Sequence, residues 1–127
     1  AAAASAARLA PLDVKAKFPV YAARMRQIAE ANEEGEAGLA QFHDLDVEFH
    51  TLILHESGNE LFAALSDTIA TVLRGRVELG KSPMKPKSDA LDAHDAVADA
   101  IAKGEPERAR SAMLDIVDEV ARALNFF

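Results

Sequence analysis

The chain has 127 residues, half of them apolar, which is enough for one domain with one hydrophobic core. The chain has 14 Lys and Arg residues and 21 Asp and Glu residues, which gives a formal net charge of -7. This charge argues against binding of this segment to nucleic acid or to an anionic membrane surface. The absence of cysteine excludes disulfides and thiolate metal sites and fits a reducing cytoplasm, and no apolar run is long enough for a membrane helix.

Apolar residues recur at helical spacing along the chain, and prolines, glycines and polar residues interrupt them. In chain order, the predicted helices span residues 1–10, 13–34, 36–56, 59 to a loop at 80–88, 88 or 89 to 104, and 105 onward. We expect the second helix to break near Pro19, the third to end at Gly58, and the sixth to begin with Pro106. Because the connections are short, the sequence predicts one all-α domain over residues 1–127, an antiparallel bundle of about six helices. The Ala-rich first helix is interpreted as truncated.

Three polar side chains fall on apolar helix faces. Asp46 and His50 are four residues apart and share one face of the predicted third helix, and His94 lies on the apolar stripe of the fifth. Since burial without a partner is unfavourable, these groups must meet one another, a metal, a ligand or water. Carboxylate and imidazole ligands from facing helices suit zinc or nickel-like ions. A buried hydrogen bond from Asp46 to either histidine, without metal, explains the same pattern.

Four further residues are candidates for contact with a bound small molecule. His43 lies one turn before Asp46 on roughly the same face, either as part of the cluster or at its boundary. Arg76 is in line with the apolar positions of the fourth helix, where its guanidinium either holds a carboxylate ligand or snorkels at the rim of the bundle. Arg74 and Thr68 on the same helix are weaker candidates.

The motifs resemble a known family. The run Asp46-x-x-Phe49-His50 followed by Ser57-Gly58-Asn59 resembles the signature of the FadR C-terminal domain, the effector domain of many GntR-type bacterial transcription regulators. The resemblance extends over nearly the whole chain, through Ala93-His94, Ala100-Ile101, Gly104-Glu105, Ala109 and Met113.

This resemblance implies a small organic-acid effector bound beside a divalent metal, a homodimer, and operator DNA bound only through an N-terminal winged helix-turn-helix that these residues do not contain. The family's metal ligands are an Asp, a His four residues later, a His matching His94, and a last His on the final helix. Ile116 stands where that last His is expected. Either three protein ligands suffice, with effector or water completing the shell, or His43 substitutes, or the site is weak or metal-free.

The sequence is therefore compatible with three hypotheses about function. The first is an effector-sensing domain that modulates DNA binding by the full-length regulator. The second is a metal-free dimerisation bundle whose buried polar groups only hydrogen-bond. The third is a metal-dependent hydrolase or lyase, which is disfavoured because no phosphate loop, nucleophile elbow or HExxH pattern occurs. The sequence does not identify the effector, the metal or the operator.

Overall fold

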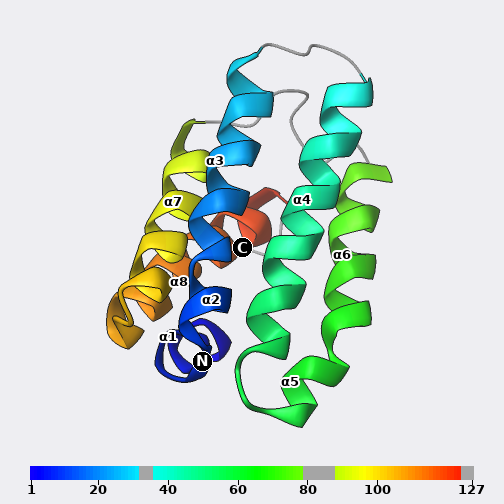
Figure 1. The fold of residues 1–127 in the computed structure, drawn as a ribbon. Helices are drawn as coiled ribbons and strands as arrows, with labels where there is room; N and C mark the ends of the chain where they lie inside the picture. The colour runs from blue at the N-terminus through cyan, green and yellow to red at the C-terminus, as the bar shows by residue number, and fades with distance from the viewer. Residues whose placement is uncertain (32–35, 79–87, 124–127) are drawn as a thin grey trace.

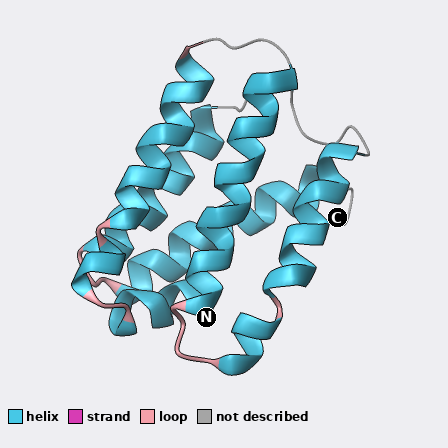
Figure 2. Cartoon of the chain, turned by 45° about the vertical axis from the view of Figure 1, so that its right-hand side comes forward, coloured by secondary structure: helices cyan, strands magenta, loops and turns pink. Residues whose placement is uncertain are grey.

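A computed structural model describes residues 1–31, 36–78 and 88–123, and these residues are almost entirely helical (Figures 1 and 2). Within them there are eight helices and no strand: α1 (Ala2–Leu9), α2 (Leu12–Lys15), α3 (Lys17–Glu30), α4 (Glu36–His55), α5 (Glu60–Ala64), α6 (Ser66–Glu78), α7 (Ser88–Ala102) and α8 (Pro106–Ala123). The predicted all-α class is confirmed. None of the described helices is both long and apolar enough to cross a membrane.

The long helices form a bundle in which sequence neighbours run in opposite directions (Figure 1). α4 lies between α3 and α6, and α3 packs on its other side against α7. α8 and α1 close the far side of the bundle, where each contacts α7 and the other. The predicted functional side chains on α4 and α7 thus belong to helices that both border α3.

The core joins α1, α3, α4, α7 and α8. α1 contributes only alanines to it, which allows a close approach to α7 and α8. Phe18 of α3 and Phe49 of α4 are fully buried and meet edge to face, with ring centroids 5.7 Å apart. Phe49 also contacts the rings of His50 and His94, at centroid distances of 5.5 and 5.2 Å. The core therefore continues directly into the candidate site.

Two predicted helices are each divided in two. The second breaks at Ala16, just before Pro19, as predicted. Pro19 lies in the first turn of α3, where a missing N–H removes no helical hydrogen bond. The fourth breaks at Leu65. There the Ser66 hydroxyl donates to the Ala63 carbonyl (2.7 Å), a local bond of the kind that competes with helix continuation.

The helix ends at the two glycines agree with the sequence analysis. Gly58 has a φ of 72° and Gly104 a φ of 68°, both in the left-handed region. A Cβ on Gly58 would lie 2.7 Å from the tip of the Leu9 side chain, so Leu9 would have to move as well. After α7, the Glu105 amide donates to the Ala100 carbonyl (2.8 Å), which completes a Schellman turn.

Candidate functional site

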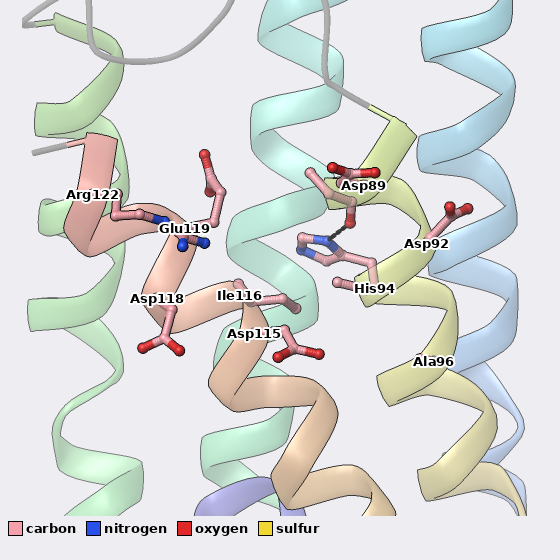
Figure 3. Close-up of a pocket in the computed structure, with 11 residues that line it drawn as sticks. Asp89, Asp92, His94, Ala96, Asp115, Ile116, Asp118, Glu119 and Arg122 are labelled. Carbon is pink, nitrogen blue, oxygen red and sulfur yellow. Dashed lines mark hydrogen bonds between the residues drawn. The ribbon is translucent and has the colours of Figure 1, made fainter.

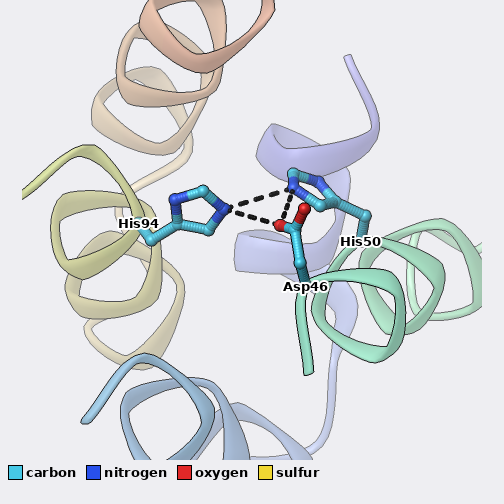
Figure 4. Close-up of side chains that lie close together, drawn as sticks. All are labelled: Asp46, His50 and His94. Atoms are coloured by element: carbon cyan, nitrogen blue, oxygen red, sulfur yellow. Dashed lines mark hydrogen bonds and ion pairs between the residues drawn. The ribbon is translucent and has the colours of Figure 1, made fainter. Parts of the chain in front are cut away.

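Asp46, His50 and His94 converge between α4 and α7 (Figure 4). The Oδ1 atom of Asp46 lies 3.1 Å from His50 Nε2 and 3.0 Å from His94 Nε2, and the two ring nitrogens are 3.3 Å apart. The side chains of Asp46, His50 and His94 are 15%, 13% and 9% exposed. The three residues that the sequence singled out therefore do lie together, nearly out of solvent.

Neighbouring side chains fix this arrangement. Arg26 of α3 donates to Asp95 of α7 through two nitrogens (3.0 and 2.7 Å) and to Asp92 through one of them (2.7 Å). These two aspartates flank His94 in the sequence, so the guanidinium holds the segment of α7 that carries the histidine. Phe49 restricts the orientation of both histidine rings from the core side.

The tautomer of His94 follows from its second hydrogen bond. Its Nδ1 lies 2.7 Å from the Ala90 carbonyl oxygen, which can only accept, so Nδ1 carries a proton. In the neutral ring, Nε2 then presents a lone pair toward the Asp46 carboxylate. Two acceptors at that distance repel each other unless a proton or a cation lies between them. A backbone carbonyl that fixes the remote nitrogen in this way is the usual support of a metal-binding histidine.

The electrostatics of the cluster favour an ionised carboxylate. Burial alone would raise the pKa of Asp46, but the adjacent His50 and His94 rings outweigh it and hold that pKa well below its ordinary value. Burial likewise lowers the pKa of His94, but the hydrogen bond and charge of Asp46, the Ala90 carbonyl and the charge of Asp95 together raise it by more. In the absence of a metal, the cluster therefore retains a proton on His94 to higher pH than an isolated imidazole would.

The same three atoms fit a metal ion. Zinc–nitrogen and zinc–oxygen bonds of about 2.0–2.2 Å place neighbouring ligand atoms roughly 3.0–3.5 Å apart. The separations of 3.0, 3.1 and 3.3 Å between the Asp46, His50 and His94 atoms fall in this range. They also fall in the range of hydrogen bonds, so a proton-linked, metal-free cluster has the same geometry.

A cleft of about 870 Å³ between α7 and α8 reaches His94 (Figure 3). His94 and Ile116 face each other in it, and Ile116 is only 6% exposed because it belongs to the core. The rest of the lining is strongly acidic, with five carboxylates against one guanidinium: Asp89, Asp92, Asp115, Asp118, Glu119 and Arg122. The acidic residues of this lining were not predicted as functional residues, although the spacing of the α8 members places them on one helix face.

None of the other predicted residues belongs to the cluster, as far as the structure describes their side chains. His43 is not among the three whose ligating atoms converge, and its Nε2 atom is buried without a hydrogen-bond partner among the described residues. Thr68 and Arg74 are exposed on α6 and do not line the cleft, and the Arg76 side chain lies outside the described part of the chain. Contact of these residues with an effector stays a prediction.

Comparison with protein families gives a match to the FCD domain over residues 1–119. The matched segment contains α1 to α7 and most of α8, and therefore all three clustered residues and Ile116. Neither curated proteins nor solved structures give a match to the chain.

Proposed function

Because the chain belongs to the FCD family, the effector-binding domains of GntR-type transcription regulators, we propose that it binds a small organic acid at a divalent metal held by Asp46, His50 and His94. Effector binding would modulate operator binding by the regulator through a population shift between arrangements of a homodimer. The family is regulatory and not catalytic, so we do not propose an enzyme.

One observation carries the metal part of this proposal. The Nδ1–H of His94 is committed to the Ala90 carbonyl, so its Nε2 lone pair and the Asp46 carboxylate point at the same place. A divalent ion held there would supply positive charge and open coordination positions for the oxygen atoms of an acid. His50 Nε2 would be the third ligand, and Ile116 offers none.

The acidic cleft indicates that acid binding requires the metal. An organic acid that approaches His94 through the cleft meets carboxylates on both helices, which repel it. A divalent ion, with one charge offset by Asp46, leaves a net positive centre that can attract the acid. We therefore expect acid binding to depend strictly on metal.

The test uses the 127-residue chain stripped of metal with a chelator. Zinc or nickel alone should raise the melting temperature, because a ligand that binds only the folded state stabilises it. Lactate or malate should raise it further with metal present and have no effect without metal. His50→Ala should abolish both responses. His55→Ala is the control, since His55 lies at the end of the same helix and its ring contacts Ser66 (3.3 Å) instead of the cluster; the rise caused by metal is measured from the melting temperature of each variant without metal.

Two results would contradict the proposal. No stabilisation by any divalent metal would favour the metal-free dimerisation bundle, which the hydrogen-bond distances of the cluster also support. If an acid raises the melting temperature equally with and without metal, the effector binds at a place other than the cluster.

A further inference from the structure

His43 on α4 carries a buried nitrogen without a partner. The side chain is partly buried, and its Nε2 atom makes no hydrogen bond within the described part of the chain. No other buried side-chain nitrogen or oxygen of the described residues is left unpaired in this way. A buried ring nitrogen that has lost its hydration and gained no partner is unfavourable, and such groups in native proteins usually serve a bound molecule or an ordered water.

The position of His43 on α4 connects it to the metal cluster. His43 and His50 are seven residues apart, so their directions from the helix axis differ by only about 20° at 100° per residue. Asp46 lies between them, on the same side of the helix. Because Asp46 and His50 both reach toward α7, His43 is directed into the bundle as well, one turn nearer the N-terminal end of α4.

The charges near the cluster distinguish its two sides. On the α7–α8 side the cleft presents carboxylates, among them Asp89 and Asp115, which oppose any second anionic group of a bound acid. On the α4 side His43 presents a ring nitrogen that can donate a hydrogen bond. An acid with one oxygen group at the cluster would therefore place its other oxygen group toward His43.

We propose that His43 contacts the effector, with its Nε2–H donating a hydrogen bond to a second oxygen-bearing group of the acid. This inference rests on the proposed function of the cluster. The rise from His43 to Asp46 is about 4.5 Å along the helix axis, at 1.5 Å per residue. That rise suits an acid with two oxygen groups a few carbons apart, such as a four-carbon dicarboxylate, better than a monocarboxylate.

The experiment compares succinate with acetate by calorimetry on the zinc-loaded chain. His43→Leu should weaken succinate binding roughly tenfold or more, as expected for loss of a hydrogen bond to a charged group, and leave acetate binding unchanged. His43→Gln, which keeps a donor, should retain part of the succinate affinity. His55→Leu is the matched control and should change neither ligand.

A second measurement separates ligand contact from a structural role. His43→Leu should melt at the same temperature as the wild type or higher without ligand, because it replaces an unpaired polar atom by an apolar group. The inference is overturned if His43→Leu lowers the affinity for both acids equally. It is also overturned if the variant lowers neither affinity, which is the result expected if His43 only contacts a buried water. If the wild-type chain binds zinc but neither acid, the proposed function itself fails, and this is visible before any variant is made.

Discussion

Replacing Asp46 by Asn should weaken the metal-free bundle and nearly abolish metal binding. In the metal-free chain, with His94 protonated at both ring nitrogens, the Asp46 Oδ1 atom accepts from His50 and His94 at 3.1 and 3.0 Å, with little exposure to water. A hydrogen bond to a charged group contributes about 1.5–3 kcal/mol, and a neutral one about 0.5–1.5 kcal/mol. Asn keeps the shape and one acceptor but loses the charge. We therefore expect the free energy of unfolding to fall by roughly 1–2 kcal/mol, or about 4–8 °C in melting temperature for a chain of this length.

The effect on metal affinity should be larger. Asp46 would supply one of three protein ligands and the only negative charge among them. Changing a residue that merely supports a ligand already lowers metal affinity about 10–100-fold, so losing a ligand should exceed this range. The assay is thermal unfolding of the wild type and of Asp46→Asn in chelator and again in excess zinc, followed by calorimetric titration with zinc.

Asp44→Asn is the matched control. Asp44 is exposed on the same helix two residues away, so the variant makes the same change in net charge and should alter stability by less than about 0.5 kcal/mol. If Asp46→Asn melts like Asp44→Asn in chelator, the hydrogen bonds of the cluster contribute nothing to stability. If it keeps the full zinc-induced increase in melting temperature, Asp46 is not a metal ligand.

Four further predictions concern pH and the supporting structure. Metal binding should tighten as pH rises toward the pKa of His94, because this ring must lose its Nε2 proton to bind. Below that pKa, binding should release a proton, which calorimetry in buffers of different ionisation enthalpy measures. Burial lowers this pKa, and Asp46, the Ala90 carbonyl and Asp95 together raise it by more. In the metal-free chain the sign is opposite: the stability contributed by His94 is complete below about pH 6.5 and lost as pH rises through its raised pKa, which unfolding in urea at several pH values detects. Arg26→Gln should lower the melting temperature and weaken zinc binding less than Asp46→Asn does, since it loosens α7 without removing a ligand. Asn59→Ala should lower the free energy of unfolding in urea by about 1 kcal/mol through loss of the α5 cap, whereas Asn59→Asp should not.

The helices themselves were predictable because apolar spacing and helix-ending residues are local properties. Gly58 and Gly104 end α4 and α7 where a left-handed residue is needed, and Pro106 begins α8. The break at Ala16 was predictable from Pro19, whereas the break at Leu65 was not. Apolar spacing continues through Leu65, and a count of apolar positions does not contain the hydrogen bond from Ser66 to the Ala63 carbonyl.

The candidate site was predictable only in part, for a related reason. Asp46 and His50 share a face through the helix repeat alone, and the apolar stripe around His94 indicated that it points inward. The clamp from Arg26 to Asp95 joins residues 69 positions apart, so no local pattern reveals it. The acidic cleft depends on how α8 lies against α7, and the unpaired nitrogen of His43 depends on the absence of neighbours, which a sequence does not display.

Ile116 occupies the position of the fourth metal ligand expected from the family, and this changes how an effector would bind. A fourth histidine would be neutral when bound, so its replacement by Ile116 leaves the charge of the proposed metal centre unchanged and frees a coordination position for the oxygen atoms of an acid. Ile116 faces His94 across the cleft and carries no polar atom, so it does not compete with the acid for this position. We therefore expect this chain to bind metal more weakly than a four-ligand site does and to depend more on the effector to complete the site, so that acid and metal each raise the affinity for the other by the same factor.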